Sequence, residues 1–111
     1  MYIYRLQILS SKSYSEEQLN NIIGVSSNFL YANWGIEIIQ SGENFSEILV
    51  YFLSLLEGKY EKLESIGISR ENISIWILYE YEGQCNMEYD PVSIKKMGEN
   101  GIALCISCWE K

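Results

Sequence analysis

The stretch Ile73-Ser74-Ile75-Trp76-Ile77-Leu78-Tyr79-Glu80-Tyr81-Glu82 decides the fold of this chain. Its odd positions carry isoleucines and then tyrosines, whereas its even positions mix Ser and Glu with Trp and Leu. Successive side chains of a β-strand point to opposite faces, so a period of two predicts a strand and argues against a helix. The rest of the expected sheet is built around this strand.

Four further segments are expected to complete a sheet of about five strands. The segment from Tyr2 to Leu9 is rich in aromatic and aliphatic residues, and the segment from Ile102 to Trp109 closes the chain as a strand. Phe29–Tyr31 and Ile36–Gln40 are expected to form a hairpin around Asn33-Trp34-Gly35, where the glycine suits a turn or a bulge.

Helices are predicted between these strands. Ser15 followed by Gln18 resembles a capping box, and Gly24 suits the left-handed conformation that ends a helix. The segment from Ser46 to about Leu56 carries apolar residues at helical spacing, so it is expected to be the main helix that packs on the sheet. Gly58 is expected to interrupt it.

Two shorter helices are expected in the second half of the chain. An apolar stripe continues from Tyr60 to Gly67 at helical spacing. Asp90 is a suitable N-cap for a helix that has Pro91 at its first position and ends near Met97-Gly98.

The order of these elements predicts an α+β fold formed by one domain, residues 1–111. We expect a single antiparallel or mixed sheet of about five strands with helices packed on one face. The other face of the sheet is expected to be partly open.

The composition narrows the possible functions. The chain has no histidine, one aspartate and a net charge of −7. Without histidine, one chain cannot form Ser-His-Asp, Cys-His or histidine-based zinc sites, so we expect a protein that is not an enzyme and needs no metal or cofactor. The chain has 15 acidic and 8 basic residues, and this excess of negative charge repels phosphate backbones and disfavours direct nucleic-acid binding. No signal peptide or long apolar run is recognisable, so a cytoplasmic protein without membrane contact is expected.

The three cysteines are expected to be reduced thiols. Cys105 and Cys108 match a Cys-x-x-Cys half-motif, but residues three apart on a strand point to opposite faces and cannot easily converge on a metal ion or form a disulfide. Cys85 lies in a loop that has no obvious group to lower the pKa of its thiol, so a catalytic role is not expected.

An acidic and tyrosine-rich segment from Tyr79 to Asp90 is the candidate functional region. Acidic groups interleaved with tyrosines can steer and anchor a cationic protein. The residues expected to bind a partner are Glu80, Glu82, Glu88, Tyr89, Asp90, Trp109 and Glu110. Three alternatives for the segment stay open: a carboxylate pair for glycoside hydrolysis, a calcium loop, and a solvated surface opposite tyrosines that pack in the core.

Much of the chain shows a resemblance to a known group of proteins. Ile75–Tyr81, the loop Gly83-Gln84-Cys85-Asn86-Met87-Glu88, Pro91–Met97 and Gly101–Cys108 resemble the ending of an uncharacterised bacterial family of small α+β domains. Such families are often encoded among polymorphic toxin genes. The small, acidic, histidine-free chain is similar to immunity proteins of contact-dependent growth inhibition systems.

The resemblance implies a toxin-antitoxin-like role by protein–protein interaction. The expected function is that of an immunity protein and nuclease inhibitor, which neutralises a basic cognate toxin domain by occluding its site. Two other functions stay open. One is a small-ligand-binding or regulatory domain with a pocket between the sheet and the helix at residues 48–56, and the other is a homo-oligomeric module that pairs through a sheet edge.

Overall fold

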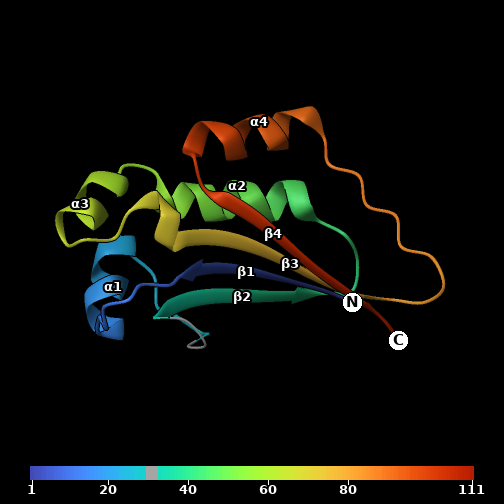
Figure 1. The fold of residues 1–111 in the computed structure, drawn as a ribbon, viewed down its shortest axis with the longest axis horizontal. Coiled ribbons are helices and arrows are strands. Elements are labelled where there is room, and N and C mark those ends of the chain that lie inside the picture. The colour runs from blue at the N-terminus through green and yellow to red at the C-terminus, as the bar shows by residue number, and fades with distance from the viewer. Residues whose placement is uncertain (30–32) are drawn as a thin grey trace.

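The computed structural model describes residues 1–29 and 33–111, and over this part the chain has an α+β fold with one mixed sheet. The sheet has four strands in the order β2-β1-β3-β4, one fewer than the roughly five expected. The strands are β1 (Tyr2–Ile8), β2 (Trp34–Gln40), β3 (Ile73–Tyr81) and β4 (Ala103–Glu110). β1 is antiparallel to β2 and β3, whereas β3 and β4 are parallel (Figure 1).

The hairpin predicted between residues 29 and 40 is wrong in the position of its turn. Residues 30–32, where most of the first strand was expected, lie outside the described residues, and Phe29 is not in a strand. Trp34 and Gly35 do not form the turn; they begin β2 and pair with β1. Trp34 is fully buried, and its indole N–H donates to Asn20 Oδ1 at 2.7 Å, so this residue belongs to the core.

Gly35 is required by a close approach of two backbone segments. A Cβ atom at this position would lie 2.8 Å from the carbonyl oxygen of Phe29. We expect Gly35→Ala to lower the free energy of unfolding by about 1–3 kcal/mol, because the clash is with backbone. Urea denaturation measures this difference, and Gly42→Ala is the control, since a Cβ there meets nothing within 4 Å. Equal stability of the two variants would contradict the close approach.

The helices are α1 (Glu16–Ile23), α2 (Phe45–Leu56), α3 (Tyr60–Ser65) and α4 (Pro91–Asn100), with a short 3-10 turn, η1, at Arg70–Asn72. The predicted caps of α1 are confirmed: Ser15 Oγ accepts the Gln18 N–H, and Gly24 is left-handed. α4 continues beyond its expected end near Gly98, because the left-handed residue that ends it is Gly101. No helix in the described part is long and apolar enough to cross a membrane.

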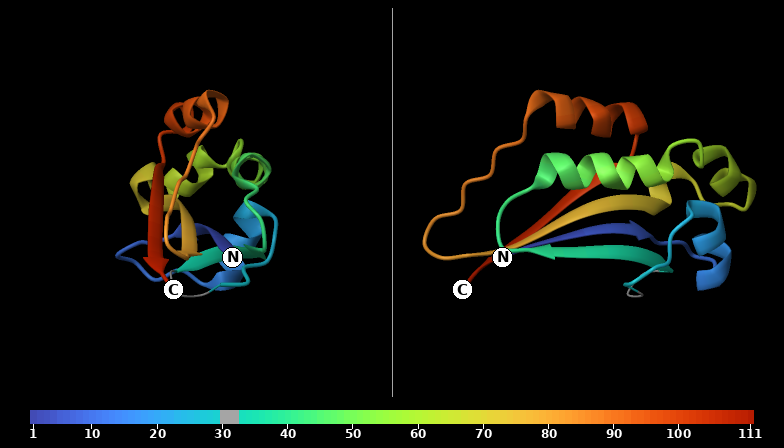
Figure 2. Two further views of the ribbon diagram at one scale, coloured as in Figure 1. Left: turned by 90° about the vertical axis from the view of Figure 1, so that its right-hand side faces the viewer. Right: turned by 180° about the vertical axis from the view of Figure 1, so that it is seen from behind.

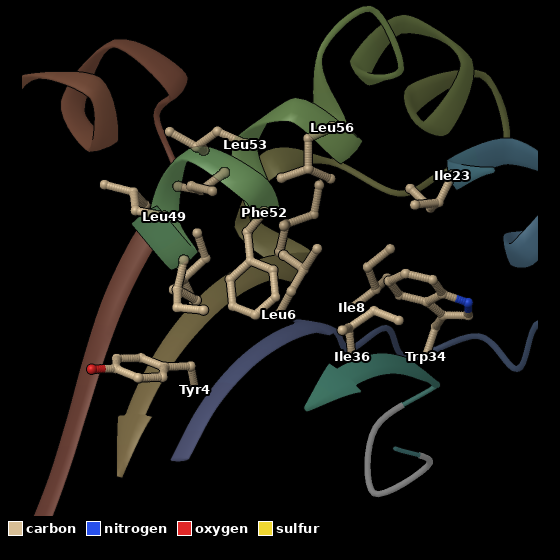
Figure 3. Close-up of a cluster of buried hydrophobic side chains, with 14 of the residues drawn as sticks. Tyr4, Leu6, Ile8, Ile23, Trp34, Ile36, Leu49, Phe52, Leu53 and Leu56 are labelled. Atoms are coloured by element: carbon tan, nitrogen blue, oxygen red, sulfur yellow. The ribbon is translucent and has the colours of Figure 1, made fainter. Parts of the chain in front are cut away.

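The helices α2 and α4 lie on one side of the sheet, with α4 beyond α2, and α1 and α3 lie near one end of the sheet (Figures 1 and 2). The predicted alternation of β3 is confirmed, since Ile73, Ile75 and Ile77 are at most 2% exposed. They belong to the same buried cluster as Phe52 of α2 and Leu6 of β1, part of which is drawn in Figure 3. This core fixes α2 over the middle of the sheet.

The opposite side of the sheet carries a mixed surface, as the alternation predicts. Arg5 and Glu37 pair there across β1 and β2, with 2.6 Å between Nε and Oε2. The guanidinium of Arg5 lies over the Phe29 ring, 4.2 Å from its centroid. Ile39 is 58% exposed and Trp109 is 41% exposed, so this surface includes apolar groups in contact with water.

Candidate functional site

The parallel pairing of β3 and β4 brings the predicted residues of both strands to one edge of the sheet. Glu80 lies opposite Trp109, and Tyr81 lies opposite Glu110. The Trp109 indole N–H donates to Glu80 Oε2 at 3.0 Å. The chain then leaves β3 at this edge, and both chain ends lie here as well (Figure 1).

Six carboxylates gather around this edge of the molecule, and we call them the acidic end. They come from β3, β4, the loop before α4 and the turn before α2: Glu43, Glu80, Glu82, Glu88, Asp90 and Glu110. Lys111 lies beside them, with its Nζ 3.5 Å from an oxygen of Glu82. Both partners are mostly exposed, so this pair compensates little of the negative charge.

Several positive charges are held in internal contacts elsewhere in the molecule. Arg5 pairs with Glu37, and Lys59 donates to the carbonyl oxygen of Ile23. Arg70 stacks on the Tyr60 ring, 3.8 Å from its centroid. The charge of the chain is therefore distributed unevenly, and its acidic end presents a negative field to the solvent.

The structure divides the predicted residues between two sides of the sheet. Strand parity places Glu80 and Trp109 on the side away from α2. Glu88, Tyr89 and Asp90 instead line a cavity on the α2 side. The residues predicted to bind a partner therefore lie on two adjoining surfaces, which meet at one edge of the sheet.

The cavity has a volume of about 390 Å³ and lies at the start of α2. Its lining comes from β1, β3, the start of α2 and the loop that leads to α4: Tyr2, Tyr4, Glu43, Phe45, Ser46, Ile77, Asn86, Met87, Glu88, Tyr89 and Asp90. A ligand pocket was expected between the sheet and the helix at residues 48–56. Ile48, Leu49 and Phe52 are instead buried in the core, so the cavity lies at the N-terminal end of the helix.

Tyrosine rings form much of the wall of this cavity. The Tyr2 ring stacks on Tyr79 with 4.3 Å between centroids, and Tyr89 meets Phe45 edge-on at 5.2 Å. The Tyr4 hydroxyl accepts the Asn44 backbone N–H at 3.0 Å and is directed away from the aliphatic core (Figure 3). These contacts fix the orientation of the rings.

The tyrosine hydroxyls of the cavity are neutral at physiological pH. Burial, together with the neighbouring Tyr79, raises the pKa of Tyr2 to about 12. Burial is also the main cause that raises the pKa of Tyr4 and of Tyr89. The Glu43 carboxylate, which lines the same cavity, contributes to the raised pKa of all three tyrosines.

Two of the carboxylates at the cavity are held by the chain itself. Glu43 Oε1 accepts the Phe45 backbone N–H at 2.6 Å, and Asp90 Oδ2 accepts the Ser93 hydroxyl at 3.0 Å. Glu88 is exposed at the rim. Among the described residues, none that lines the cavity is basic.

The cavity residues that precede β3 were not predicted from the sequence. Tyr2 and Tyr4 could have been placed on one face by their spacing of two on a strand. Glu43 had no such signal, because it is 45 residues away from Glu88 in the chain and meets it only through the packing of α2.

The cysteines form no metal site in the described part, where no group of three or more Cys, Asp or Glu residues could hold an ion. Cys105 lies opposite Trp76 and Cys108 opposite Tyr79, so the predicted divergence of the Cys-x-x-Cys pair is confirmed. The sequence did not indicate that the Cys85 thiol lies beside that of Cys108.

Cys85 is expected to react slowly with alkylating reagents. Burial and the neighbouring Cys108 thiol raise the pKa of Cys85, so less of the reactive thiolate is present at neutral pH. Cys108→Ala removes that neighbour, and we expect faster alkylation of Cys85 by iodoacetamide at pH 7.5, measured by peptide mass spectrometry. Cys105→Ala is the matched control and is expected to leave the rate at Cys85 unchanged. A slower reaction in Cys108→Ala would contradict this assignment.

Comparisons with protein-family models, curated proteins and solved structures give no match for this chain. The similarity to immunity-protein domains therefore stays an expectation from the sequence.

Proposed function

We propose that this chain is an immunity protein that binds and neutralises a cognate bacterial toxin domain with a basic site, such as a nuclease. The observation that supports this function best is the acidic end, where six carboxylates gather with one exposed, weakly paired lysine beside them. In this proposal the protein acts in the cytoplasm and is not an enzyme.

Inhibition would follow from competition for the basic site. A nuclease holds phosphates with Lys and Arg, so a negative surface attracts the same groups and excludes the nucleic acid. Trp109, 41% exposed beside Glu80, is suited to anchor the contact, because tryptophan side chains often dominate binding energy at interfaces.

Co-expression with the carboxy-terminal domain of any toxin-like gene that neighbours the gene for this chain tests the proposal. We expect growth to be rescued and a stoichiometric complex to form, with an affinity that falls as the salt concentration rises. Failure of every neighbouring toxin-like product to bind would contradict the proposal.

The cavity favours a second candidate function, that of a small-ligand-binding domain. Its volume of about 390 Å³ lies within the usual range for ligand pockets of about 300–1,000 Å³. A small molecule that co-purifies with the isolated protein, in the absence of any protein partner, would favour this second function.

A further inference from the structure

The cavity at the start of α2 combines an aromatic wall with carboxylates. Its wall includes Tyr2, Tyr4, Phe45 and Tyr89, and its carboxylates are Glu43, Glu88 and Asp90. The faces of aromatic rings attract cations, and carboxylates add direct charge attraction. An anion would be repelled here, and an apolar ligand would have to remove water from the carboxylates.

We propose that this cavity binds one organic cation, a guanidinium or an alkylammonium group, with its charge at the carboxylates and its carbon chain against the tyrosine rings. The cation is supplied either by an Arg or Lys side chain of a protein partner or by a free amine. In the first case the inference rests on the proposed function, and in the second it is independent of it.

The cavity is organised for such a ligand before binding. Glu43 is held by the Phe45 N–H and Asp90 by the Ser93 hydroxyl, so these carboxylates lose little freedom when the cation enters. The hydroxyl oxygens of the tyrosines that line the cavity can also accept N–H donors from the ligand.

The cavity is also distinct from the surface around Trp109. Glu80 and Trp109 lie on the other side of the sheet by strand parity, whereas the cavity residues lie on the α2 side. A protein that covers the acidic end could therefore insert one basic side chain into the cavity while its remaining surface contacts the edge of the sheet.

Titration of the isolated protein with arginine methyl ester, followed by two-dimensional amide NMR, tests the proposal. We expect saturable shifts confined to the residues that line the cavity and their neighbours, 2, 4, 43–46, 77 and 86–90. Butylurea, which resembles the side-chain end of arginine in shape but carries no charge, is expected to give no saturable shift. Equal binding of the two compounds, or shifts spread over all acidic surfaces, would overturn the proposal.

Three single variants locate the site. We expect Glu88→Gln and Glu43→Gln each to weaken binding of arginine methyl ester by about threefold to fivefold, as partly exposed charge pairs do. Glu88 is exposed, so its variant is expected to fold normally. Glu64→Gln, an exposed site on α3, is the matched control and is expected to leave binding unchanged. Unchanged binding in both cavity variants would overturn the assignment.

The source of the cation is distinguished in two further measurements. If a toxin side chain fills the cavity, arginine methyl ester competes with the toxin for the protein. If a free amine fills it, mass spectrometry of the denatured purified protein detects that amine. Failure to bind the ester rejects the cavity proposal alone, whereas failure to bind any toxin rejects the proposed function alone.

Discussion

Replacement of Trp34 by alanine is expected to lower the free energy of unfolding by about 3–5 kcal/mol, because a fully buried tryptophan leaves a large cavity. A domain of this size is stabilised by only about 5–15 kcal/mol, so the variant loses a large part of its stability. Urea or thermal denaturation followed by far-UV circular dichroism measures the difference.

Trp109→Ala is the matched control, because Trp109 is 41% exposed, and we expect a loss of only about 1 kcal/mol, which includes its hydrogen bond to Glu80. A third variant, Trp34→Phe, keeps an aromatic ring but removes the indole N–H that donates to Asn20. Its expected cost lies between those of the two alanine variants. Similar losses for Trp34→Ala and Trp109→Ala would contradict the buried position of Trp34.

Local patterns in the sequence predicted most elements of the fold. The alternation in β3 was predictable because one face of a strand is buried, and the caps of α1 were predictable because Ser15 and Gly24 have strong conformational preferences. The start of β2 was not predictable in this way. Gly35 suggested a turn, whereas the structure uses it where the Phe29 backbone approaches β2.

The site could be predicted only in part, for a related reason. The acidic residues after β3 were visible as one segment, but their division between two sides of the sheet depends on strand parity and on the parallel pairing with β4. The contributions of Tyr2, Tyr4 and Glu43 depend on long-range packing, for which one sequence contains no direct signal. The cavity is therefore a result of the tertiary structure.

Charge reversal at the edge of the sheet is expected to have the largest effect on binding to the proposed toxin partner. Glu80→Lys combined with Glu82→Lys should slow association by about tenfold to a hundredfold at low salt, because the acidic end then attracts a basic protein less strongly. Stopped-flow or surface plasmon resonance measurements at several salt concentrations would show the difference shrinking as the salt concentration rises.

The matched control carries the same change in net charge at a different place. Glu64→Lys combined with Glu71→Lys alters exposed residues of α3 and of the turn before β3. At 0.1 M salt we expect this variant to associate at nearly the normal rate, because these positions lie outside the acidic end and charges beyond a Debye length, about 10 Å at that salt concentration, are largely screened. Equal slowing in the two double variants would mean that net charge alone steers the partner. An unchanged rate in the Glu80 and Glu82 variant would exclude this edge from the interface. Either result would leave the cavity, which these substitutions do not alter, to be tested by its own ligand.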